Sequence, residues 1–210
     1  MNVLINELEN SQKFSEVLNH IKTQQSPISL SGLSDMGKIQ VLAALNNNLN
    51  KKICIVTYNQ IQAKRLVKDL EYFTSKAAML PKKELVTYDY IAESKDLPYE
   101  RIEVLNKIQN NEVDILVLTI ETLMQNIIPK EVLYKNALTI KLGDSINIDY
   151  LKQKLVNLGY ERNELIDGRG QFSIRGGIVD IATSKNSGVR IELWGDEIDS
   201  IRKFSIVSQR

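Results

Sequence analysis

The chain has 210 residues and a formal net charge of +1; 43% of its residues are hydrophobic and 25% are charged. This composition is ordinary for a globular protein with a core of useful size. The balanced charge excludes a global basic field that drives nonspecific nucleic-acid binding, so any contact with DNA would need a local patch. A chain with one cysteine, Cys54, and one histidine, His20, cannot form an internal disulfide or a zinc site of His and Cys ligands.

The location of the protein follows from the same features. The longest apolar runs fall far short of the roughly 20 residues that span a membrane. The first residues, MNVLINELENSQKF, lack the basic start of a signal peptide. Cys54 lies in the apolar run KKICIVTY, which predicts a buried thiol in a reducing compartment. We therefore expect a cytoplasmic protein without a membrane partner.

Up to about residue 128 the sequence alternates between helical and strand-like patterns. Apolar residues recur at helical spacing in residues 11–24, 37–49 and 59–73, and a further helix is expected from Pro98. Short apolar runs at 27–32, 52–58 and 114–120 predict strands, and the β-branched run at 52–58 indicates a strand buried on both faces. This alternation predicts an α/β fold with a parallel sheet covered by helices.

After Pro129 the pattern changes to a small α+β domain. A strand is expected at 137–144, then a capped amphipathic helix within 145–160 that carries Leu151, Leu155 and Leu158 on one face. Strands at 171–177, 178–183 and 189–207 are separated by glycine turns, which is typical of an antiparallel meander. In the last of these, Gly195-Asp196 is expected to turn and Trp194 to pack. We predict two domains, residues 1–128 and 129–210.

The segment 28–39, ISLSGLSDMGKI, has the spacing of a phosphate-binding loop. Gly32 is followed by four residues and then by Gly37-Lys38. In such loops glycines let backbone N–H groups wrap a phosphate at a helix N-terminus, and the lysine neutralises the phosphates. Ser34 could still donate a hydrogen bond. The spacing, between an expected strand and helix, predicts a loop of this ancestry built on Gly32, Ser34, Gly37 and Lys38.

The same segment lacks parts that ATP hydrolysis needs. Ile39 stands where a Ser or Thr hydroxyl would bind Mg²⁺, and Asp35 places a carboxylate where the triphosphate would lie. The strand near 114–120 ends in Thr119-Ile-Glu121 rather than in Asp-Glu. We expect a degenerate phosphate loop without turnover, and weak nucleotide binding stays open.

The most distinctive run lies at 159–210. It contains GYER at 159–162, GQFSIRGGIVDI at 170–181 and RIELWGDEIDSIR at 190–202, and LPYE stands upstream at 97–100. These motifs resemble the module shared by bacterial transcription-repair coupling factors and the excision-repair protein UvrB, and the resemblance covers nearly the whole chain. UvrB has an intact Gly-Lys-Thr and an arginine-rich segment like FRRGTFRVRGD, so the chain is more similar to the coupling factors. It departs from them after Asp180-Ile181, where the usual Phe/Tyr-Pro is missing.

The resemblance implies a function. It identifies the chain as an N-terminal, non-catalytic adaptor fragment without a cofactor of its own, whose small domain recruits UvrA to stalled RNA polymerase. RNA polymerase and DNA would be contacted by other parts of the full-length protein, an ATP-dependent DNA translocase that uses ATP and Mg²⁺. The alternative is a nucleotide-binding enzyme, an ATPase like UvrB. A DNA-binding domain is weakly supported, because no basic run is interleaved with aromatic residues.

Candidate partner contacts come from the strand at 171–177. Strand alternation places Phe172 and Ile174 on one face and Arg175 on the other. Arg162, Arg169 and Arg175 lie close in sequence, with no acidic residue between Asp167 and Asp180, which predicts a basic patch on one face. With the resemblance, Arg162 and Arg175 are the expected UvrA contacts, followed by Arg169 and Phe172. Scattered solvated arginines and a core Phe172 remain the alternative.

Overall fold

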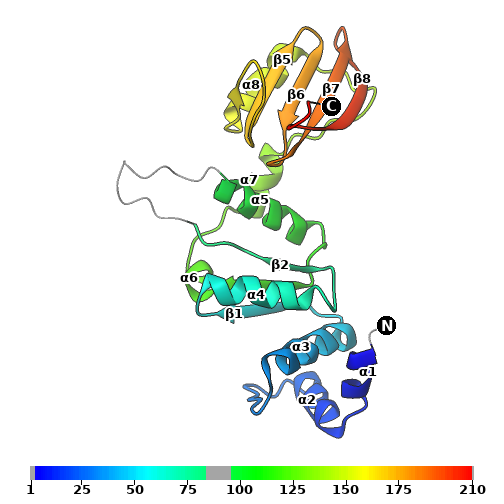
Figure 1. Ribbon diagram of the computed structural model, residues 1–210, viewed down its shortest axis with the longest axis vertical. Helices are drawn as coiled ribbons and strands as arrows, with labels where there is room; N and C mark the ends of the chain where they lie inside the picture. The colour runs from blue at the N-terminus through cyan, green and yellow to red at the C-terminus, as the bar shows by residue number, and fades with distance from the viewer. Residues whose placement is uncertain (1–2, 84–95, 210) are drawn as a thin grey trace. The chain divides into compact units, whose positions relative to one another are not determined.

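The computed structural model describes residues 3–83 and 96–209 and forms two compact units (Figure 1). Of the described residues, 3–83 and 100–125 belong to the first unit, and 96–99 and 126–209 belong to the second. Helix α5, Asp96–Gln109, contributes to both and contains Pro98 in its first turn.

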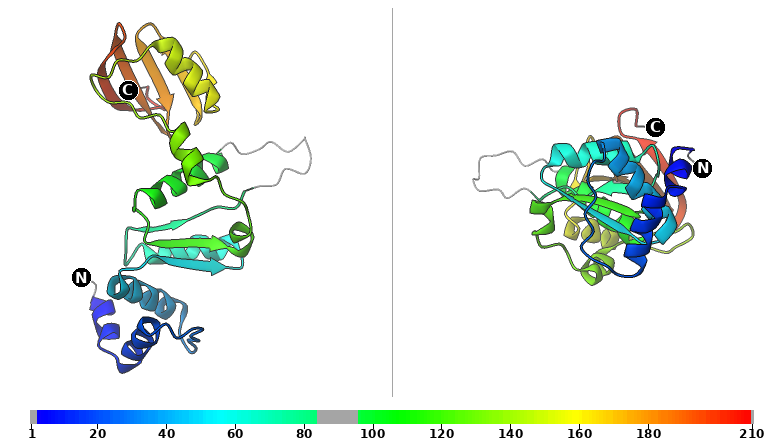
Figure 2. Two further views of the ribbon diagram at one scale, coloured as in Figure 1. Left: turned by 180° about the vertical axis from the view of Figure 1, so that it is seen from behind. Right: turned by 90° about the horizontal axis from the view of Figure 1, so that it is seen from below.

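The first unit begins with three helices that share one apolar cluster (Figure 2, blue). They are α1, Val3–Glu9; α2, Gln12–Lys22; and α3, Asp35–Leu49. Ser11 starts α2, because its hydroxyl accepts a hydrogen bond from the Phe14 N–H, and Phe14 is buried in the cluster. The helix predicted at 11–24 is therefore confirmed.

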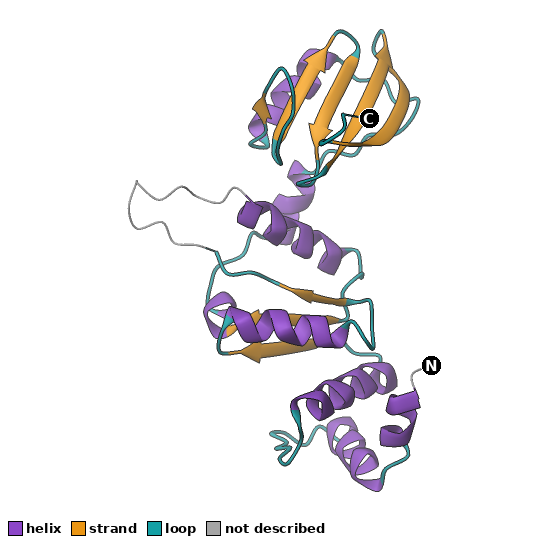
Figure 3. Ribbon diagram, in the orientation of Figure 1, coloured by secondary structure: helices purple, strands orange, loops and turns teal. Residues whose placement is uncertain are grey.

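The three-stranded sheet of the first unit is parallel, as predicted (Figure 3). Its order is β1-β3-β2, with β1 at Ile53–Thr57, β2 at Ala77–Met79 and β3 at Ile115–Thr119. Helices α3 and α4, Gln60–Leu70, both pack on one face of this sheet. The apolar cluster that joins them contains Ile39, Ala63, Leu70, Ile115 and Val117. The short helix α6, Ile120–Leu123, follows β3 directly.

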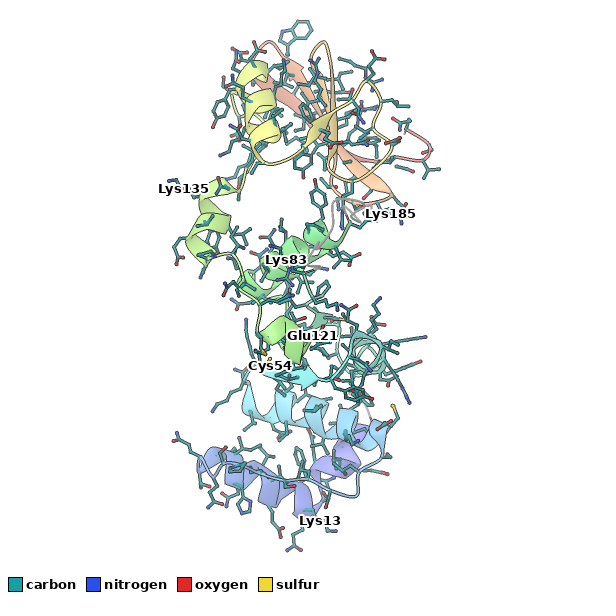
Figure 4. All side chains as sticks on the ribbon, turned by 90° about the vertical axis from the view of Figure 1, so that its left-hand side faces the viewer. Lys13, Cys54, Lys83, Glu121, Lys135 and Lys185 are labelled. Atoms are coloured by element: carbon teal, nitrogen blue, oxygen red, sulfur yellow. The ribbon has the colours of Figure 1, made fainter. Side chains whose placement is uncertain are left out.

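The opposite face of β1 is open, which differs from the sequence-based prediction. Cys54 is exposed (Figure 4) and Val56 is 46% exposed. An apolar run predicts burial only if a second layer packs over the strand. Within residues 3–83 and 96–125, the main apolar clusters place no such layer over these two side chains. The expectations that both faces of β1 are buried and that the Cys54 thiol is buried are therefore wrong.

The second unit is an α+β fold built on a five-stranded sheet of order β4-β5-β6-β7-β8. Strand β4 is parallel to β5, and the other neighbours are antiparallel. The strands are β4, Glu161–Arg162; β5, Gln171–Arg175; β6, Ile178–Ala182; β7, Ser187–Trp194; and β8, Glu197–Ser205. Helix α8, Ile148–Asn157, covers one face with Leu151 and Leu155, and α7, Lys130–Asn136, precedes it. The predicted meander is confirmed.

The strand predicted at 137–144 is wrong. Leu138 and Ile140 do pack against the core of the second unit, which explains the apolar pattern. The backbone turns instead of extending, since the Asp144 carboxylate accepts a hydrogen bond from the Lys141 N–H at 2.7 Å and Gly143 takes a φ of 80°. Within the described chain, the backbone of this segment meets β8 only at its end: the Gly143 N–H donates to the Ile198 carbonyl at 3.0 Å, and Ser145 and Glu197 form an isolated bridge.

Position 188 in β7 requires a glycine, because neighbouring atoms leave no room for a Cβ atom. A substitution there tests the register of β7 and β8. A Cβ atom at this position would lie 2.7 Å from Cε1 of Phe204 and 2.8 Å from the Ile181 carbonyl oxygen. We expect Gly188→Ala to lower the free energy of unfolding by about 1–3 kcal/mol, because the sheet has to shift to admit a methyl group. Urea unfolding measures the change.

Gly168→Ala is the matched control. A Cβ atom there would meet its nearest neighbour, Nε2 of Gln171, at 3.8 Å, an ordinary contact. Its free energy of unfolding should stay within about 0.5 kcal/mol of the starting protein. Equal effects of the two substitutions would contradict the register of β7 and β8.

Candidate partner-binding surface

The candidate phosphate loop does not follow a strand. Residues 25–34 form neither strand nor helix, so the strand predicted at 27–32 is wrong. Helix α3 begins at Asp35, two residues before Gly37, and Gly32 takes a φ of 76°. Short apolar runs such as PISL are ambiguous between strand and irregular structure, which is why the pattern misled.

The start of α3 satisfies its own polar groups. Ser34 is the N-cap, and its hydroxyl accepts a hydrogen bond from the Gly37 N–H at 3.1 Å. The ammonium of Lys38 lies 3.2 Å from Oδ1 of Asp35, and Arg65 approaches the other oxygen at 3.8 Å. The Ser34 hydroxyl, the Gly37 N–H and the Lys38 ammonium therefore each have a partner within the chain.

Ile39, at the position where the phosphate-loop pattern would have Ser or Thr, has a packing role. Its side chain is 0% exposed and lies in the cluster formed with Ala63 of α4 and Val117 of β3. An apolar residue here joins α3 to the sheet. A hydroxyl at this position would be buried among apolar side chains rather than presented to a nucleotide.

Ile39→Thr, the substitution that restores the phosphate-loop pattern, should destabilise the protein. We expect a loss of about 1–3 kcal/mol in the free energy of unfolding, since a methylene group is removed and a hydroxyl is buried. Asn47→Thr, at an exposed site in the same helix, controls for helix propensity. Urea unfolding of both variants is the measurement, and an unchanged Ile39→Thr protein would place Ile39 outside the core.

The described residues offer neither a metal site nor a membrane-spanning helix. Within 3–83 and 96–209, three or more His, Cys, Asp or Glu side chains are nowhere grouped so that they could hold a metal ion. Across the same residues, no helix has the length and apolar character that crossing a membrane requires.

The two faces of the sheet in the second unit differ: one is apolar, and the other combines a charged cluster with a smaller apolar one. The face toward α8 carries the apolar core, including Phe172, Val179, Ile181, Ile191 and Leu193. Because side chains alternate along each strand, the opposite face, here called the charged face, presents Arg175 of β5, Asp180 of β6, and Arg190 and Glu192 of β7. The rest of this face holds a smaller buried cluster of Ile166, Ala182, Phe204 and Ile206.

Asp180 joins two arginines on this charged face. Its Oδ1 accepts from Nε of Arg190 at 2.6 Å, and its Oδ2 accepts from Nη2 of Arg190 at 2.9 Å. The same Oδ2 accepts from Nη2 of Arg175 at 2.7 Å. The Asp180 side chain is 2% exposed, that of Arg190 is 17% exposed and that of Arg175 is 51% exposed. A buried carboxylate thus anchors one guanidinium that reaches solvent.

Neighbouring groups fix Arg190 further. Its guanidinium lies 4.8 Å from the centre of the Phe204 ring. Donation to the Asp180 carboxylate raises the pKa of Arg190, although burial alone would lower it. Beside it, Glu192 pairs with Arg202 and accepts a hydrogen bond from Ser200 at 2.8 Å. The charge of Glu192 is therefore matched by its own partner.

The three arginines predicted as one patch do not share a face. Arg162 of β4 is exposed, but its register partner is Phe172, so it points to the face opposite Arg175. The guanidinium of Arg169 lies 5.8 Å from the centre of the Tyr99 ring. Only Arg175 belongs to the charged face defined above, and the single-face prediction is corrected.

Arg169 belongs to an aromatic cluster within the second unit. The rings of Tyr99 and Tyr160 meet edge to face, 6.3 Å apart. A Cβ atom at Gly170 would lie 2.0 Å from the Tyr99 hydroxyl, so the cluster requires a glycine there. Burial raises the pKa of Tyr160. The arrangement gives Arg169 a role in packing.

Two aromatic side chains lie where the sequence did not place them. Phe172 is 0% exposed, so its expected contact with a partner is corrected to a core position. Trp194 was expected to pack but is 86% exposed, next to the turn at Gly195. Sequence reasoning also missed Asp180 and Arg190; the available signal was an acid inside the apolar strand IVDIA.

Comparisons with known proteins match residues 138–210 to a family profile and nearly the whole chain to curated relatives. A family profile described as the UvrB interaction domain matches residues 138–210. The transcription-repair-coupling factor of Bacillus subtilis strain 168 is 35% identical over 97% of this chain. Those of Staphylococcus aureus USA300 and Staphylococcus haemolyticus are 30% and 32% identical over 100% and 97% of the chain.

Over 97–100% of its length the chain is similar to transcription-repair-coupling factors. Residues 138–210, which match the UvrB interaction domain, contain the whole five-stranded sheet and its charged face. The chain spans 17–18% of the length of these relatives. The homology therefore concerns one segment of a much longer kind of protein.

Proposed function

We propose that this chain is a non-catalytic adaptor module of a transcription-repair-coupling factor that recruits UvrA in transcription-coupled nucleotide excision repair. Residues 129–210 are the UvrA-binding domain, and residues 1–128 are a domain derived from a phosphate-loop NTPase. The proposal is supported by the match of residues 138–210 to the UvrB interaction domain. The observation that carries it is the half-exposed side chain of Arg175, whose guanidinium is anchored by Asp180 on the charged face of that domain.

The full-length protein is proposed to act on other partners through other segments. It would displace stalled RNA polymerase as an ATP-dependent DNA translocase, and its ATP and Mg²⁺ would be bound outside residues 1–210. The names and lengths of the relatives support this division. Such a role places the protein in the cytoplasm, together with the DNA on which it acts.

Arg175 and Arg162 are the proposed contacts with UvrA. Arginine is a frequent interface anchor, because its planar fork pairs with carboxylates through two hydrogen bonds. The two residues lie on the neighbouring strands β4 and β5 and both are exposed, but on opposite faces, so a partner that contacts both has to wrap the β4 edge of the sheet. Arg169 supports the surface indirectly, through its packing against Tyr99.

Arg175→Ala should weaken UvrA binding by about 30-fold, or about 2 kcal/mol, because a central charged anchor is lost. Arg162→Ala, at the edge of the surface, should cost about 1 kcal/mol. Calorimetric titration of each variant with UvrA measures the affinity, and circular dichroism shows whether the fold is kept.

Arg65→Ala is the control. Arg65 is 69% exposed on α4 in the first unit and carries the same charge and size. Its substitution should leave the affinity for UvrA unchanged. If Arg175→Ala binds as tightly as the starting protein, Arg175 is not part of the UvrA surface.

The segment Gly32–Lys38 is proposed to be a degenerate phosphate loop. The buried Ile39 and the pairing of Lys38 with Asp35 support this proposal. We expect residues 1–210 to release no phosphate from ATP above the background, with or without Mg²⁺, in a coupled phosphate assay. Magnesium-dependent turnover that is lost in Lys38→Ala would favour the alternative of an ATPase like UvrB.

A further inference from the structure

We propose that Asp180 is a positioning residue for partner binding: its carboxylate holds the Arg175 guanidinium so that the exposed edge of the fork receives a carboxylate of the partner. This inference rests on the proposed binding of UvrA and specifies its chemistry. It assigns a binding role to a residue that cannot itself touch a partner, since the Asp180 side chain is 2% exposed.

The hydrogen bonds leave Arg175 oriented and still available. Arg175 donates to Asp180 through Nη2, at 2.7 Å. A guanidinium has five N–H donors in a rigid plane, so a bond at one nitrogen fixes the plane and leaves donors for another acceptor. Half of the Arg175 side chain is exposed to solvent. A free arginine would lose rotamer entropy on binding, whereas an anchored one has already lost part of it.

The charges around Arg175 indicate which group of the partner it binds. Arg190 binds both oxygens of Asp180 and is largely buried, so this pair is close to neutral. The positive charge of Arg175 is therefore in excess within the Arg175–Asp180–Arg190 cluster. Glu192 does not cancel it, because Glu192 is paired with Arg202. An excess positive charge on a planar fork is best matched by a carboxylate.

The competing explanation is that Asp180 only stabilises the sheet by pairing with Arg190. The two explanations differ in whether the effect of Asp180 on binding requires Arg175. A double-mutant cycle separates them, because a residue that acts through Arg175 has no further effect once Arg175 is removed.

The experiment measures the dissociation constant for UvrA with the unsubstituted chain, Arg175→Ala, Asp180→Asn and the double variant. We expect Asp180→Asn to weaken binding by about tenfold in the otherwise unsubstituted chain. In the Arg175→Ala chain the same substitution should weaken binding by less than about twofold. An equal loss of affinity in both chains, or no loss of affinity when Asp180→Asn is made in the unsubstituted chain, would overturn the inference. Unfolding temperatures report the structural effect of each substitution separately.

Arg175→Lys tests the same inference without touching the buried carboxylate, in case Asp180→Asn fails to fold. Lysine keeps the charge but cannot bridge two carboxylates as a fork, so its affinity should fall to within about threefold of Arg175→Ala. A lysine variant that binds like the unsubstituted chain would overturn the inference. An unsubstituted chain that does not bind UvrA would overturn the proposed function, and this inference with it.

Discussion

Asp180 carries a negative charge that is almost completely removed from water. Such a carboxylate is tolerated only when cations and hydrogen bonds compensate the loss of solvation, and removal of a partner from a buried pair is strongly destabilising. Here Arg190 supplies two hydrogen bonds and Arg175 a third. Because the three residues stand on β5, β6 and β7, the charge cluster requires one register among these strands. A slip by one residue would move Asp180 into the apolar core against α8.

The β5–β6 hairpin brings Arg175 to its position. Arg175 pairs with Ile178 across a two-residue loop, and Gly176 takes a φ of 59°, which few other residues adopt readily. Gly177 lies so close to β7 that a Cβ atom would be 2.6 Å from the Leu193 carbonyl oxygen. Gly176 thus allows the turn, and Gly177 allows the close approach of β6 to β7. Together they place the guanidinium at the end of a strand, beside the buried carboxylate.

The sequence predicted the elements that have a clear period or clear turn signals. The strands around Arg175 and Trp194 were found because glycines separate alternating runs. The runs at 27–32 and 137–144 were misread, since short apolar segments can pack against a core without joining a sheet. The placement of side chains was harder to predict. The face of Arg162 depends on its pairing with Phe172, and register between distant strands cannot be read from either strand alone.

The central claim is that UvrA binds the charged face and the adjoining edge of the small domain. Amide hydrogen exchange of residues 1–210, measured with and without UvrA, tests it directly. We predict slower exchange in the β5–β6 hairpin around Gly176 and in β4, and unchanged exchange in helices α1 to α3. Protection confined to the first unit, with the hairpin unaffected, would contradict the account.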